Sequence, residues 1–191
     1  MKTYKAKFEE NYLAIQEPCD NRKGFRMRYT YIGPWYVWNT SGERVRSVKR
    51  TVGILCVLSV MLFLCGSLMD SRLNAARYVE AFGTLSVAAL LYEVIGVIQF
   101  SAAKAKMTSL DFDDIKMKMM LAPLLHGILL ICAAAAAVIV LVGSKTGSID
   151  IIVILCYFFS GLLSLLIFQC YRSLPWRKDR NENPKIGPTK H

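Results

Sequence analysis

The chain has 191 residues, enough for one domain, and 54% of them are apolar. Its 24 Lys and Arg residues outnumber its 14 Asp and Glu residues, which gives a formal net charge of +10. Four apolar stretches, residues 51–69, 81–103, 119–143 and 151–171, contain a single charged residue, Glu93. Helices of water-soluble proteins carry charge along one face, so this distribution excludes a water-soluble fold.

The first predicted element is a short helix near the N-terminus. Tyr4, Phe8, Tyr12 and Ile15 recur at spacings of four, four and three residues, which places them along one face of a helix. We expect Pro18 and the polar run that follows it to end this helix.

Residues 25–32 alternate between two faces, as β-strands do, and Gly33-Pro34 separates them from the aromatic run Trp35-Tyr36-Val37-Trp38. This pattern predicts a β-hairpin that turns at Gly33-Pro34. Two interpretations stay open: the aromatic and basic side chains contact lipid headgroups or a partner, or the aromatic ones form a small cytoplasmic core. The candidate contact residues are Arg26, Arg28, Tyr29, Tyr31, Trp35, Tyr36 and Trp38.

The four apolar stretches predict transmembrane helices, because each can cross a hydrocarbon layer of about 30 Å at about 1.5 Å per residue. The predicted fold class is an all-α integral membrane protein, a four-transmembrane-helix bundle with a small N-terminal helix and β-hairpin segment. The expected helices span about 51–69, 78–103, 109–143 and 150–171. The expected parts are a cytoplasmic or interfacial segment 1–50, a transmembrane domain 51–171 and a basic disordered tail 172–191.

The loop before the third helix contains Thr108 and Ser109, followed by Asp111, Asp113 and Asp114. Hydroxyl side chains cap helix N-termini, and carboxylates in the first turn complement the helix dipole. This reading, a helix that starts near Ser109, is favoured over a cation site because no Gly-containing calcium loop surrounds the aspartates.

The distribution of basic residues predicts the orientation. Fourteen Lys and Arg residues lie within about 20 residues of the helix ends on the side of the two termini, against Arg72, Arg77 and Lys145 on the other. We therefore expect both termini in the cytoplasm, with the protein in the cell membrane. The six cysteines are expected as free thiols, because most lie inside helices and the others face the reducing cytoplasm.

Two ionisable side chains lie inside the predicted helices. Glu93 and His126 are each seven residues from the cytoplasmic end of their apolar stretch, Phe100 and Met119 respectively, so both lie about 10 Å deep. Contact between them is expected, since a buried carboxylate needs a partner. We favour a structural polar clamp. The alternatives are that the two residues couple protons or ions, that they contact a substrate, or that they do not meet at all.

The sequence contains no HExxH, Walker or GxSxG motif, so we expect no enzyme activity and no cofactor. With only two histidines, a histidine-based metal site is not expected either. The leading hypothesis is a non-catalytic accessory or assembly subunit of a membrane complex. The alternative is a small transporter or channel component that uses Glu93 and His126. Expected partners are the anionic inner lipid surface and a protein partner or second copy, but not nucleic acid.

Overall fold

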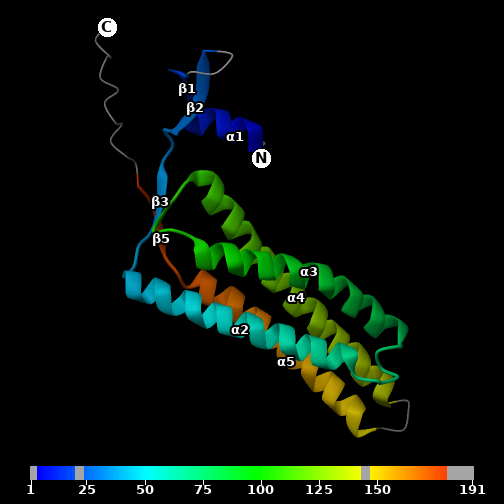
Figure 1. The fold of residues 1–191 in the computed structure, drawn as a ribbon. Helices are drawn as coiled ribbons and strands as arrows, with labels where there is room; N and C mark the ends of the chain where they lie inside the picture. Colours follow the sequence, from blue (N-terminus) through cyan, green and yellow to red (C-terminus); the bar gives the residue numbers. More distant parts are fainter. Residues whose placement is uncertain (1–3, 20–23, 143–146, 180–191) are drawn as a thin grey trace. The chain divides into compact units, whose positions relative to one another are not determined.

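The computed structural model describes residues 4–19, 24–142 and 147–179 of the chain (Figure 1). The chain divides into two compact units, a smaller one of residues 1–39, 104–114 and 176–191 and a larger one of residues 40–103 and 115–175. The elements in chain order are α1 (Tyr4–Asn11), β1 (Tyr12–Pro18), β2 (Phe25–Tyr31), β3 (Trp35–Trp38), α2 (Gly42–Leu68), α3 (Arg77–Ala102), β4 (Lys106–Met107), α4 (Ser109–Val142), α5 (Ser148–Arg172) and β5 (Trp176–Asp179).

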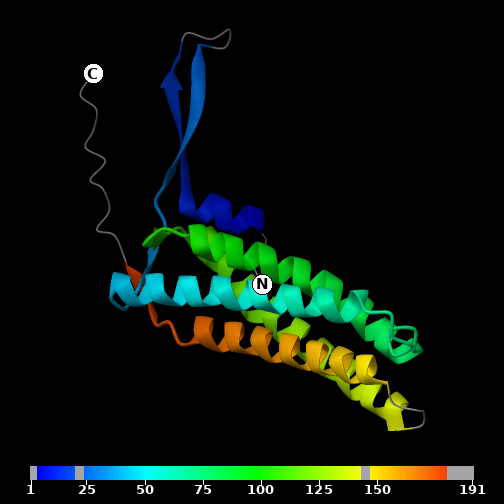
Figure 2. The same cartoon turned by 60° about the horizontal axis from the view of Figure 1, so that its bottom comes forward.

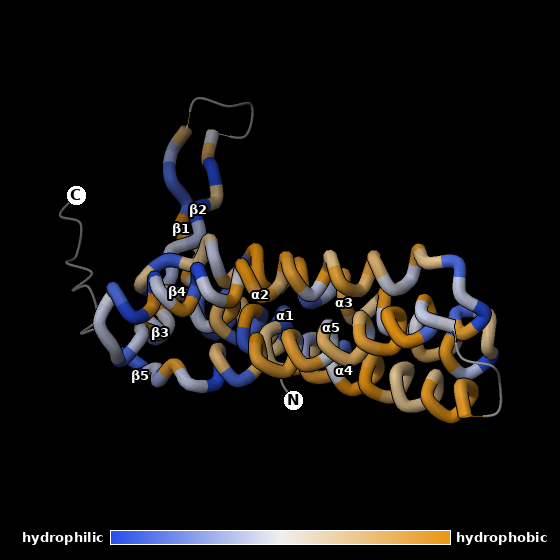
Figure 3. The backbone as a smooth tube through the Cα atoms, turned by 90° about the horizontal axis from the view of Figure 1, so that it is seen from below, coloured by the Kyte–Doolittle hydropathy of each residue, from blue (hydrophilic) through white to orange (hydrophobic). Residues whose placement is uncertain are grey.

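The larger unit is built from α2, α3, α4 and α5, which lie side by side (Figures 1 and 2). Each of these four helices is long and apolar enough to cross a membrane. Apolar residues cover all four of them (Figure 3), and large side chains such as Met61, Leu91 and Ile139 remain exposed. An outer surface of this composition is compatible with a surrounding lipid bilayer.

The helix boundaries lie close to the predicted ones, except at the start of α2. This helix begins at Gly42 rather than at residue 51, because Ser41 caps its N-terminus and accepts a hydrogen bond from the Arg44 backbone N–H at 3.3 Å. The first turns of α2 carry charged side chains, and hydropathy cannot detect helix in a polar segment. The predicted start of α4 at Ser109 is confirmed, with Thr108 Oγ1 accepting from the Asp111 backbone N–H.

Small residues allow α4 and α5 to approach each other closely. A Cβ atom on Gly127 would lie 2.9 Å from the Gly161 carbonyl oxygen and 2.8 Å from Leu165 Cγ. A Cβ atom on Gly161 would in turn lie 3.0 Å from the Gly127 carbonyl oxygen. Helices in lipid pack through such small residues, because backbones can then come into van der Waals contact.

The connection between α2 and α3 is tied to the start of α5 by polar contacts. Ser71 Oγ donates to Asp150 Oδ1 at 2.7 Å, and the Gly147 backbone N–H donates to Asp150 Oδ2 at 3.1 Å. Further along α5, Tyr157 Oη donates to Asn74 Oδ1 at 2.8 Å. The Ser71 and Tyr157 bonds thus join the α2–α3 connection to α5, and the Gly147 bond caps the start of α5.

The smaller unit contains a β-hairpin, but its turn differs from the predicted one. β1 and β2 pair antiparallel, with Tyr12 opposite Tyr31 and Pro18 opposite Phe25. The predicted turn at Gly33-Pro34 is therefore wrong, and the predicted helix ends at Asn11. A short apolar stripe fits helical and strand periods almost equally well, and pairing with β2 decides for the strand.

A second sheet of the smaller unit joins segments that are far apart in the sequence. Its strand order is β4-β3-β5, and Tyr36 of β3 lies opposite both Met107 and Lys178. The Tyr36 ring stacks on Phe112 with centroids 4.5 Å apart, and Phe112 contacts Trp176 at 4.9 Å. The aromatic side chains thus form a small core for this sheet.

This sheet also corrects the predicted division of the chain. Residues 1–50 are not a separate part, because β3 pairs with strands from two later segments. The predicted disordered tail is wrong for Trp176–Asp179, which forms β5. The rest of the predicted tail, residues 180–191, lies outside the described residues.

The close approach of α4 and α5 makes a prediction about stability. Gly127→Ala should lower the free energy of unfolding by about 1–3 kcal/mol, because the added methyl group meets a backbone carbonyl that cannot move aside. Gly53→Ala in α2 is the matched control, since a Cβ atom there has nothing within 4 Å. The control should instead raise stability by about 0.5–1 kcal/mol through helix propensity. Equal effects of the two variants in detergent unfolding would contradict this packing.

Candidate functional site

Glu93 of α3 and His126 of α4 meet inside the bundle. His126 Nδ1 lies 2.8 Å from Glu93 Oε2, and both side chains have no exposed surface. The depth comparison from the sequence placed the two groups at one level, and the structure brings them into contact. Sequence separation does not prevent this, because α3 and α4 are consecutive helices joined by a short connection.

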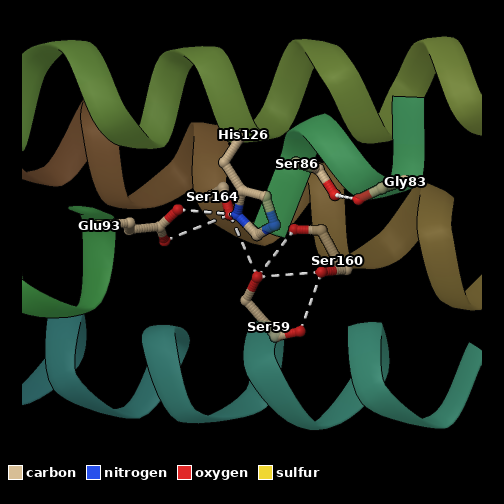
Figure 4. A network of polar contacts seen from close by, with 7 residues as sticks. All are labelled: Ser59, Gly83, Ser86, Glu93, His126, Ser160 and Ser164. Atoms are coloured by element: carbon tan, nitrogen blue, oxygen red, sulfur yellow. Dashed lines mark hydrogen bonds and ion pairs between the residues drawn. The ribbon is translucent and has the colours of Figure 1, made fainter. Parts of the chain in front are cut away.

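Serine side chains from two further helices extend this contact into a network (Figure 4). Ser164 of α5 lies 2.9 Å from His126 Nδ1 and donates to Glu93 Oε1 at 3.3 Å. Ser59 of α2 lies 3.1 Å from Ser164 Oγ and 3.0 Å from Ser160 Oγ. All four helices of the bundle therefore contribute at least one side chain.

The α2–α5 part of the network is closed by reciprocal bonds to the backbone. Ser160 Oγ donates to the Ser59 carbonyl oxygen at 2.9 Å, and Ser59 Oγ lies 3.2 Å from the Ser160 carbonyl oxygen. Both hydroxyl groups are fully buried. Another buried serine, Ser86, stays outside the network, because its hydroxyl donates to the Gly83 carbonyl oxygen of its own helix (Figure 4).

The environment favours a hydrogen-bonded pair of Glu93 and His126. A lone carboxylate in an apolar interior is unfavourable by several kcal/mol, whereas hydrogen bonds from His126 and Ser164 compensate Glu93. The other ring nitrogen, His126 Nε2, is buried and has no hydrogen-bond partner among the described residues. An unpaired lone pair is less costly there than an unpaired N–H, so the geometry favours a proton on Nδ1 rather than on Nε2.

The network does not have the geometry of a Ser-His-acid hydrolase. In such an enzyme one ring nitrogen contacts the acid and the other contacts the serine. Here Glu93 and Ser164 share Nδ1 of His126, and all three side chains are fully buried. In the described ranges, no group of three or more His, Cys, Asp and Glu residues is placed to hold a metal ion.

The seven residues proposed to contact the membrane surface or a partner separate into two groups. One group belongs to β2 and is exposed, and it comprises Arg26, Arg28 and Tyr29. The other group is half-buried in aromatic contacts, and it comprises Tyr31, Trp35, Tyr36 and Trp38. The aromatic contacts agree with the small-core interpretation for the second group, and contact of the first group with lipid headgroups or a partner stays a prediction.

Sequence reasoning did not single out the three serines of the network. A signal for two of them exists, because Ser160 and Ser164 are four residues apart in an otherwise apolar stretch and share one helix face. Ser59 could not be distinguished, since a single serine in a membrane helix often bonds only to its own backbone. No protein-family model matches this sequence, and searches of curated proteins and of solved structures find no match either.

The contact between Glu93 and His126 predicts coupled effects of mutation. His126→Ala should lower the free energy of unfolding by about 1–3 kcal/mol, because it leaves a buried polar group without its main partner. Glu93→Gln keeps the shape and an acceptor and should cost less. The double variant should lose less stability than the sum of the single variants.

Detergent-unfolding measurements of the four chains test this coupling. Ser86→Ala is the control, since this buried hydroxyl bonds only within its own helix, and combining it with His126→Ala should give additive losses. Strict additivity of the Glu93 and His126 variants would show that the two side chains do not interact.

Proposed function

We propose that this chain is a non-catalytic accessory or assembly subunit of a membrane complex, inserted in the bilayer by α2, α3, α4 and α5. The observation that carries the proposal is the β1–β2 hairpin, which exposes apolar and aromatic side chains. Phe25, Met27 and Tyr29 are 42%, 41% and 54% exposed, and the strand register places them on one face. An exposed face of this composition marks a protein-interaction site.

The hairpin also leaves its backbone edges available. Among the residues that the structure describes, its sheet contains only β1 and β2, so each of these strands has one edge with no strand beside it. A two-stranded hairpin is marginally stable by itself, and unpaired edges can add a strand from another chain. A partner protein, or a second copy of this chain, would cover the apolar face and complete the sheet.

The buried network supports a role without catalysis. Glu93, His126 and Ser164 bond to one another and have no exposed surface, so a substrate has no access to them. Their contacts instead join helices, which is the role of the polar clamp that the sequence predicts.

The proposed location is the cell membrane, with both termini in the cytoplasm. The excess of basic residues on the terminal side supports this orientation, because Lys and Arg are retained on the cytoplasmic side. In that orientation the exposed Arg26 and Arg28 of β2 lie on the side of the anionic inner lipid surface.

Co-purification from native membranes in mild detergent tests the proposed docking face. The wild-type chain should retain a protein partner in near-stoichiometric amount, quantified by mass spectrometry. Phe25→Ser combined with Met27→Ser should reduce that partner at least about ten-fold, since two buried apolar contacts of about 1 kcal/mol each would be lost.

Leu13→Ser is the matched control for this experiment. Leu13 is 40% exposed on the same hairpin. It pairs with Thr30, so its side chain lies on the other face of the hairpin from Phe25 and Met27. Retention of the partner by the control and its loss from the double variant would support the assigned face. Equal recovery from all chains, or no partner with the wild type, would contradict the proposal.

Proton coupling is a second candidate function, and one observation favours it. His126 Nε2 is buried with no partner among the described residues, next to a carboxylate bonded to Nδ1 of the same ring. A histidine with one nitrogen in use and one available can accept a proton on one side and release it on the other. Intramembrane Glu and His residues of this kind occur in proton relays.

Liposomes that contain only this chain distinguish the second candidate from the first. If the pair carries protons, the wild-type chain should dissipate an imposed pH gradient, and Glu93→Gln should abolish the flux because an amide does not take up the proton. Ser86→Ala should leave the flux intact. A gradient that decays no faster than in empty liposomes would reject proton transport by this chain.

A further inference from the structure

The outward side of α3 and α4 contains an apolar hollow of about 330 Å³. Ala88, Ala89 and Ala122 leave space between the two helices, because their side chains end at Cβ. Leu85 and Leu121 also line the hollow and are 59% and 50% exposed, so it opens to the surroundings of the bundle. The buried network lies elsewhere, since none of its five residues lines the hollow.

One end of the hollow carries a cation. Tyr92 lines it, and Lys118 Nζ lies 5.9 Å from the centroid of the Tyr92 ring. Lys118 also donates to Gln99 Oε1 of α3 at 2.9 Å, which holds the ammonium group between the two helices. It precedes Leu121, another lining residue, by three residues, or about 4.5 Å along the helix.

We propose that this hollow binds one acyl chain of an anionic phospholipid, whose phosphate is contacted by Lys118. The apolar lining suits a hydrocarbon chain, and the ammonium group at one end complements a negative headgroup. In the proposed orientation, Lys118 lies at the cytoplasmic end, facing the leaflet that holds anionic lipids. This site rests on the proposed insertion in a bilayer. A lipid is favoured over a transmembrane helix of another protein as the occupant, because an apolar helix would not require the ammonium group of Lys118 at the end of the hollow.

Photocrosslinking of the full-length chain tests this site. The chain is reconstituted in phosphatidylcholine bilayers that contain phosphatidylglycerol with a diazirine on its acyl chain, and the labelled peptides are mapped after irradiation. Labels should concentrate on residues 85–92 of α3 and 121–129 of α4. Ala88→Phe fills the hollow and should remove most of this labelling. Ile98→Phe is the control, since Ile98 is 62% exposed on the same helix and does not line the hollow.

The headgroup contact is tested separately. Lys118→Gln should lower labelling by the phosphatidylglycerol probe about five-fold, which corresponds to about 1 kcal/mol for one basic side chain at an anionic surface. Labelling by the same probe with a phosphatidylcholine headgroup should change little. Arg50→Gln removes one exposed charge from the cytoplasmic end of α2 and should leave both signals unchanged.

Three results would overturn the lipid site. Labels spread evenly around the bundle, or labelling unaffected by Ala88→Phe, would show that the hollow has no preferred acyl chain. Disulfide-linked dimers of an Ala88→Cys chain would show that a second copy covers the hollow instead. Resistance of the reconstituted chain to alkaline carbonate extraction is measured in parallel. Extraction of the chain would reject bilayer insertion itself, whereas a resistant chain with even labelling would reject only the lipid site.

Discussion

The burial of a carboxylate among apolar helices is the constraint on which the rest of the bundle depends. Glu93 has no exposed surface, so its partners must come from other helices. His126 and Ser164 supply them from α4 and α5, and Ser59 connects the group to α2. Because hydrogen bonds act only over short distances, these contacts require all four helices to remain close at one level.

Backbone proximity makes the network possible. His126 and Gly127 are neighbours on α4, and Ser160 and Gly161 are neighbours on α5. The two glycines meet where α4 and α5 approach each other, with no room for a Cβ atom on Gly127 and only a tight fit for one on Gly161. The polar contacts and the small residues therefore depend on each other. A bulky residue at the crossing would separate the helices and leave buried polar groups without partners.

The smaller unit follows a different principle, because one of its sheets is formed by short segments that lie far apart in the sequence. β3, β4 and β5 are separated in the sequence by the helix pairs α2–α3 and α4–α5. Each helix pair runs out and back, so the strands before and after it can pair with each other. The aromatic side chains of Tyr36, Phe112 and Trp176 then pack together. The β1–β2 hairpin packs Tyr12 and Tyr29 against Phe8 of α1, but it keeps Phe25 and Met27 exposed, which is why we propose the docking role for it.

The four apolar helices can be predicted from hydropathy along the chain, which needs no knowledge of neighbouring segments, and helical rise alone predicts that Glu93 and His126 lie at matching positions on α3 and α4. The strand partners of β3, the turn of the β1–β2 hairpin and the three serines of the network are visible only in the folded chain. Strand pairing and hydroxyl contacts depend on which segments come within a few ångströms of one another. That distance is set by the packing of the whole chain, and no local pattern of residues encodes it.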